Sequence, residues 1–142
     1  MENLWPDFDD IENIASPNKI LETQAEFLGH KTGNIVKGKV VDKSMKGSEK
    51  FRYDFIIYAN AGNYSYGLFN IEYDIHMYPV LVRMGTNLAQ EIKDTEKYKG
   101  ENIFGVEVYD EEELLKILSD IFNAEITKKV VEGIIAQYEV PF

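Results

Sequence analysis

Apolar residues recur every three or four positions after Ser16 and Pro17, which is the period of a helix with one buried face. Ile20 and Leu28 belong to this stripe. Ser is a favoured N-cap, and Pro is a favoured first helical residue. The pattern therefore predicts a helix from Pro17 to about Leu28. Gly29 and Gly33 offer a flexible stop, and Lys31 offers a cation at the negative helix end.

The spacing then changes to an alternation of apolar and polar residues, which is typical of strands. It predicts four strands, at residues 35–41, 51–59, 64–73 and 80–84. In the turn at 60–63, Gly62 and the two Asn residues are expected to supply positive φ angles. Apolar residues on both faces of 51–59 place that strand centrally. Consecutive strands with short connections predict an antiparallel meander.

The last third of the chain returns to helical spacing. Residues 86–101 are polar and fit a helix or a loop, whereas 103–109 fits a fifth strand. Asp110 and Glu113 have the spacing of a capping box, and two apolar stripes follow it. These stripes fit one kinked helix, or a helical hairpin in which Asn123 caps the second helix. The predicted class is α+β, with an N-terminal helix, a four- or five-stranded antiparallel meander and this C-terminal helical region.

A length of 142 residues fits one domain, residues 1–142. Residues 1–16 are acidic and carry Trp5 and Phe8, so we expect an acidic arm whose apolar side docks on the domain. An apolar share of 44% excludes a wholly disordered chain. No stretch approaches the roughly 20 apolar residues of a membrane span, and the first residues do not resemble a signal peptide.

The chain lacks Cys, which excludes disulfides, a thiolate nucleophile and Cys-based metal sites, and which favours a cytoplasmic location. His30 and His76 are the only histidines, and no G-x-S-x-G nucleophile motif is present. The segment 29–33 contains a Lys-Thr pair but lacks the spacing and the preceding strand of a phosphate-binding loop. We expect no catalytic residue and no cofactor, and leave enzyme activity open.

Charge is unevenly distributed along this chain of net charge -10. The overall acidity argues against generic nucleic-acid binding, because phosphate is repelled. Residues 30–53 are the exception, with seven Lys or Arg against two acidic residues. This segment is either the solvated face of a hairpin or a patch for phosphate or an acidic partner.

Glu72, Asp74 and His76 form the one constellation that suggests a metal. At a spacing of two on a strand they would project from one face, where two carboxylates and an imidazole could bind a divalent ion. Asp54 on the neighbouring strand could join them as part of a metal-dependent hydrolase. Apolar residues alternate with the three, so the solvated side of a half-buried strand explains the same pattern.

Two further sets of residues suggest contacts with another protein. Tyr58, Tyr64 and Tyr66 lie in the meander, and Tyr is frequent both in interfaces and in strands. Glu111 and Glu112 either complete a capped helix start or belong to an acidic contact surface.

The favoured function is a non-catalytic, acidic protein-interaction domain, of an inhibitor, immunity or adaptor type, with a basic protein partner. A small-ligand-binding module, in which the sheet and a helix enclose an apolar pocket, is one alternative. The metal-dependent hydrolase is the other. Sheet edges and the C-terminal residues leave a homodimer open.

Overall fold

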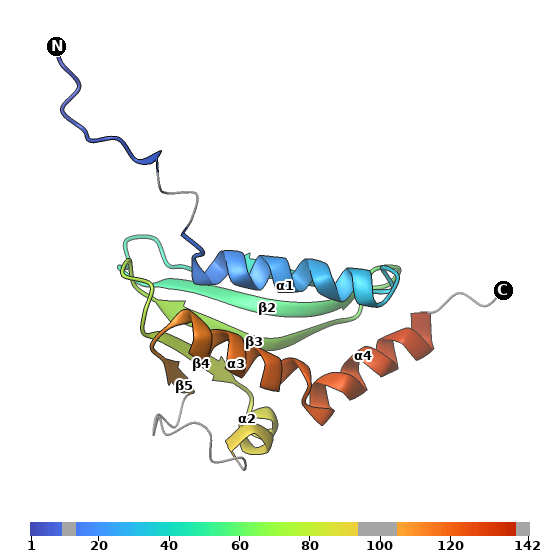
Figure 1. Ribbon diagram of the computed structural model, residues 1–142. Coiled ribbons are helices and arrows are strands. Elements are labelled where there is room, and N and C mark those ends of the chain that lie inside the picture. Colours follow the sequence, from blue (N-terminus) through green and yellow to red (C-terminus); the bar gives the residue numbers. More distant parts are fainter. Residues whose placement is uncertain (10–13, 94–104, 139–142) are drawn as a thin grey trace.

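The computed structural model describes residues 1–9, 14–93 and 105–138 (Figure 1). The elements in chain order are α1 (Pro17–Lys31), β1 (Val36–Asp42), β2 (Phe51–Ala59), β3 (Ser65–Tyr73), β4 (Val80–Met84), α2 (Thr86–Lys93), β5 (Val106–Val108), α3 (Glu111–Phe122) and α4 (Glu125–Tyr138). No helix in these ranges has the length and apolar character needed to cross a bilayer.

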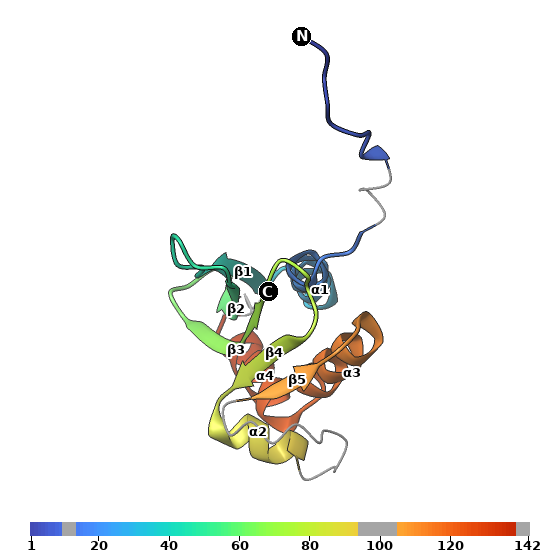
Figure 2. The ribbon, with the colours of Figure 1, turned by 90° about the vertical axis from the view of Figure 1, so that its left-hand side faces the viewer.

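The five strands form one antiparallel sheet in the order β1-β2-β3-β4-β5. The predicted α+β class, the meander and the fifth strand are therefore confirmed. The bounds of β2 and β4 are those that the alternation predicts. Helices α1 and α3 lie on the same side of the curved sheet (Figure 2).

One face of the sheet carries the core. Along β2, Phe55, Ile57 and Ala59 are each 1% exposed, whereas Arg52 on the other face is exposed. The rings of Phe55 and Phe69 stack with centroids 5.1 Å apart. Phe122 from the end of α3 lies 5.4 Å from the Phe55 ring. This aromatic cluster joins the middle of the sheet to the helical layer.

Helix α1 is longer than the sequence predicts, because it continues through Gly29 to Lys31. The chain reverses at Gly33 and Asn34, whose φ angles are 59° and 66°. Left-handed backbone of this kind favours Gly and Asn, so the helix ends where these two residues follow one another. At the other end Ser16 holds the N-cap position, but its side chain makes no capping bond.

The turn between β2 and β3 forms as predicted, but the role expected for Gly62 is wrong. None of residues 60–63 has a positive φ angle, and the left-handed glycines lie at Gly33 and Gly47 instead. Gly62 instead leaves room for a side chain from α4. The ring of Tyr138, at the end of α4, occupies the place where a Cβ atom of residue 62 would lie.

The C-terminal region consists of two helices rather than one kinked helix. At the start of α3 the capping box is confirmed: the N–H of Glu113 donates to Oδ1 of Asp110 at 2.8 Å. The expected role of Asn123 is wrong, because this residue ends α3 and its side chain donates to the carbonyl of Ser119. A residue distant in sequence caps α4 instead: Glu91 of α2 accepts from the backbone N–H of Glu125 at 2.7 Å.

The described part of the acidic arm, residues 1–9, is exposed and extends away from the body of the molecule (Figure 1). Its docking stays a prediction.

Candidate functional site

A groove of about 860 Å³ opens between α1 on one side and α3 and α4 on the other, with β2 at its base. We call it the α1–α3–α4 groove. Ile57 and Phe55 form the base and are each 1% exposed. The half-buried ring of Phe122 closes the base toward α3. The base of the groove is therefore formed by the same aromatic cluster that joins the sheet to the helices.

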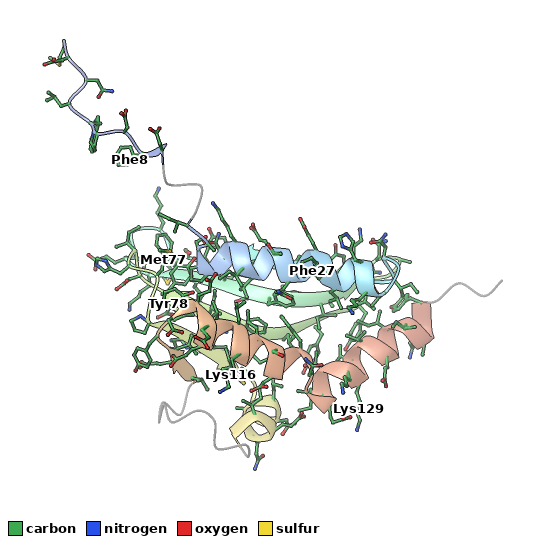
Figure 3. All side chains as sticks on the ribbon, viewed as in Figure 1. Phe8, Phe27, Met77, Tyr78, Lys116 and Lys129 are labelled. Atoms are coloured by element: carbon green, nitrogen blue, oxygen red, sulfur yellow. The ribbon has the colours of Figure 1, made fainter. Side chains whose placement is uncertain are left out.

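Two large apolar side chains stand on opposite lips of this groove. Phe27 of α1 is 50% exposed, and Leu115 of α3 is 44% exposed. Figure 3 labels Phe27 on the part of α1 that lies above α3 and α4. Leu28 and Val131 also line the groove and are partly buried. Apolar surface on facing helices over an aromatic base is characteristic of binding grooves.

The polar rim of the groove is basic. Lys31 at the end of α1 and Lys128 in α4 line it, and Glu132 is the single acidic lining residue among the residues that the structure describes. His30 lies beside Lys31 in the last turn of α1. This local balance is the reverse of the net charge of -10 on the whole chain.

The end of α1 is fixed to the sheet by Thr32. Its Oγ1 accepts a hydrogen bond from the N–H of Val36 at 3.1 Å and donates one to the carbonyl oxygen of Val36 at 2.8 Å. On the α4 side, the buried hydroxyl of Thr127 donates to the carbonyl of Ile121 at 2.6 Å. These bonds hold the walls of the groove in a defined position.

The three tyrosines predicted as an interface do not lie together. Tyr58 lies on the outer face of β2, where Lys39 of β1 stands 5.1 Å from its ring centroid. Tyr66 packs against the core on the helical side. Tyr64 lines a separate hollow of about 400 Å³ beside α4 and is 44% exposed.

Glu111 and Glu112 lie in the exposed first turn of α3. Burial, followed by the negative charges of Glu111 and Asp110, raises the pKa of Tyr78. Tyr78 lies between β3 and β4, near the end of β3 at Tyr73. Tyr64 lies at the opposite end of β3, next to Ser65. Nine residues of strand separate these ends, roughly 27 Å. The predicted acidic and tyrosine sets therefore belong to different ends of the sheet.

Glu72, Asp74 and His76 do not share a strand face, because β3 ends at Tyr73. Glu72 forms an ion pair with Arg83 at 2.7 Å. Asp74 accepts a hydrogen bond from the backbone N–H of His76 at 2.8 Å. Within residues 1–9, 14–93 and 105–138, no three His, Cys, Asp or Glu side chains converge on a point where a metal could bind.

Asp54 faces Asn70 across β2 and β3 on the outer face of the sheet. One side-chain oxygen of each residue is buried and has no hydrogen-bond partner in the described part of the chain. The hydroxyl of Tyr78 is buried in the same way. These groups lie apart from the α1–α3–α4 groove.

Comparisons with protein-family models, with curated proteins and with solved structures each give no significant match to this chain. The function must therefore be inferred from the groove and its chemistry. The sequence suggested an apolar pocket between the sheet and a helix as one alternative, but not the position of this groove or its lining residues, although Leu115 offered a signal. It lies beside the buried Leu114, outside the apolar stripe that α3 turns toward the core.

Proposed function

We propose that this protein is a non-catalytic protein-interaction domain, whose α1–α3–α4 groove receives an apolar segment of a partner. The observation that carries the proposal is the exposure of Phe27 and Leu115 on the two lips of one groove. Fully burying a side chain of this size is worth about 1.5–3 kcal/mol. Both side chains are about half exposed, so a partner that covers them gains roughly half of that from each.

The charge of the partner's segment follows from the rim. Lys31 and Lys128 favour a segment in which acidic residues flank the apolar ones. The body of such a partner can still be basic, because the net charge of -10 attracts basic proteins at long range. An inhibitor or adaptor that binds a basic partner, through Glu111 and Glu112 as a second contact, is the form of the proposal that the sequence favours. A cytoplasmic location remains part of it.

The test compares two double variants with equal changes in charge. Phe27→Asp with Leu115→Asp alters the groove, while Met45→Asp with Ile75→Asp alters exposed apolar residues elsewhere. Each tagged protein is used for affinity capture from the native cell extract, followed by mass spectrometry. We expect a stoichiometric protein with the wild type and the control, and its loss with the groove variant. Equal capture by all three proteins would refute the proposal, as would an empty capture by the wild type.

A small-ligand-binding module is the second candidate, because about 860 Å³ falls within the range of small-molecule pockets. Native mass spectrometry of the purified protein separates the two candidates. A bound molecule that is present in the wild type and lost in the groove variant would support the second candidate.

A further inference from the structure

We infer that the groove is occupied by the N-terminal arm of a second copy of this chain, through residues 4–8, in a reciprocal homodimer. The inference rests on the proposed function to the extent that both use the α1–α3–α4 groove. It goes further by naming the occupant.

The arm has the apolar side chains that such a groove requires. Leu4, Trp5 and Phe8 are 87%, 76% and 59% exposed. Figure 3 shows Phe8 on the extended arm, far from Phe27 of its own chain. An exposed apolar cluster of this size is characteristic of a segment that binds another surface.

The charges of the arm and of the groove are complementary. Glu2, Asp7 and Asp9 flank the apolar residues of the arm. Lys31 and Lys128 stand on the rim of the groove, and within residues 1–9, 14–93 and 105–138 Glu132 is the one acidic residue in its lining. Seating the arm therefore places carboxylates beside ammonium groups and buries aromatic rings on the aromatic base.

The position of both parts on α1 allows the exchange to be reciprocal. The arm leaves the body at Pro17, the first residue of α1, whereas the groove lies along the last turns, near Phe27 and Lys31. A helix of 15 residues is about 22 Å long. Two α1 helices that approach in antiparallel orientation would bring each arm to the groove of the other copy. Such a twofold arrangement closes on itself and stops at two copies.

Trp5 provides a direct readout, because it is the only Trp of the chain. Its fluorescence emission is measured over a range of protein concentrations, alongside the mass from sedimentation equilibrium. We expect a dimer mass, and an emission that shifts to shorter wavelength as the dimer forms. Emission typical of water-exposed Trp at every concentration, with a monomer mass, would overturn the inference. A blue-shifted emission that does not depend on concentration, with a monomer mass, would place the arm in its own groove and also overturn it.

Complementation between variants provides the second test. The arm variant Leu4→Asp with Phe8→Asp keeps Trp5 and has an intact groove, while Phe27→Asp with Leu115→Asp has an intact arm. Each variant alone should lose at least about tenfold in dimer affinity. Their mixture should form a dimer with one intact contact between an arm and a groove. The control Met45→Asp with Ile75→Asp should dimerise like the wild type. A dimer that survives in both variants uses another interface and refutes the inference.

Failure of this inference is distinguishable from failure of the proposed function. If the wild type is a monomer with exposed Trp5, yet the groove variant loses a captured protein, the second copy is excluded and the groove remains a protein-binding site. If the groove variant retains every captured protein, the proposed function fails whatever the oligomeric state. Circular dichroism of each variant confirms that the fold is retained.

Discussion

The α1–α3–α4 groove and the outer face of the sheet differ in the kind of side chain that they present, although one oxygen each of Asp54 and Asn70 on the outer face has no hydrogen-bond partner among the described residues. On the outer face, Arg83 pairs with Glu72, and Lys39 stands over the ring of Tyr58. In the groove, Phe27 and Leu115 remain about half exposed above an apolar base. Surface charges that pair with one another need no partner, whereas apolar lips over an aromatic floor gain free energy when they are covered. The comparison supports the proposal that the groove, rather than the outer face, is the binding surface.

The largest expected difference in the free energy of unfolding is between a substitution at the base of the groove and one at its lip. Phe55→Ala should lower the free energy of unfolding by about 3–5 kcal/mol, because it removes a buried ring that contacts Phe69 and Phe122. Phe27→Ala removes the same atoms from an exposed lip and should cost less than about 1 kcal/mol. Urea unfolding of both variants measures the difference. Similar losses would mean that Phe27 is part of the core rather than of a binding surface.

A smaller effect is expected where α2 supports the far wall of the groove. Glu91→Gln should lower stability by about 1 kcal/mol, because the carboxylate loses its charge while it still caps the N–H groups of Glu125 and Ile126. Glu26→Gln on the exposed side of α1 makes the same change of charge and is the control. Equal thermal unfolding of both variants would show that this cap contributes nothing.

A still smaller free-energy effect is expected from the ion pair on the outer face of the sheet. The side chains of Arg83 and Glu72 are part-buried, at 30% and 24% exposed, so solvent still reaches their ion pair and partly screens it. A double-mutant cycle with Arg83→Met and Glu72→Gln should give a coupling energy below about 1 kcal/mol. A coupling of several kcal/mol would contradict the view that this face is a solvated surface.

The smallest effect concerns the acidic start of α3. Reversing Glu111 and Glu112 to Lys should slow association with a basic partner by roughly a few-fold, and change dissociation less. The control reverses Glu22 and Glu26 on α1, where both carboxylates are also exposed. Surface plasmon resonance with the captured partner provides both rates. Equal slowing by both double variants would show that only the net charge matters.

The fold was predictable to the extent that it depends on local pattern. Strand β2 and strand β4 have the bounds that alternation predicts, because each strand faces one continuous core. The end of α1 was predicted less closely, since the sequence offers both Gly29 and Gly33 as a stop, and the structure keeps Gly29 inside α1 and reverses the chain at Gly33. The start of α4 could not be predicted, because its cap comes from another element.

The position and the lining of the groove could not be predicted from the sequence, for a physical reason. Its lips come from α1 and α3, and its base from β2, so it exists only once the helices are placed on the sheet. Periodicity reports which face of a helix is buried, but not which exposed residue of another helix lies opposite. The tyrosines were grouped for the same reason, because they lie close together along the chain. In the sheet, Tyr58 and Tyr66 lie on opposite faces.

The cap of α4 by Glu91 has a consequence for motion. Glu91 accepts hydrogen bonds from the backbone N–H groups of Glu125 and Ile126, which follow it by 34 and 35 positions in the chain. Opening of α2 therefore releases the first turn of α4 as well. Because α4 forms one wall of the groove, a bound segment and α2 should influence each other through this carboxylate. Slower hydrogen exchange in α2 would then accompany occupation of a groove that α2 does not line.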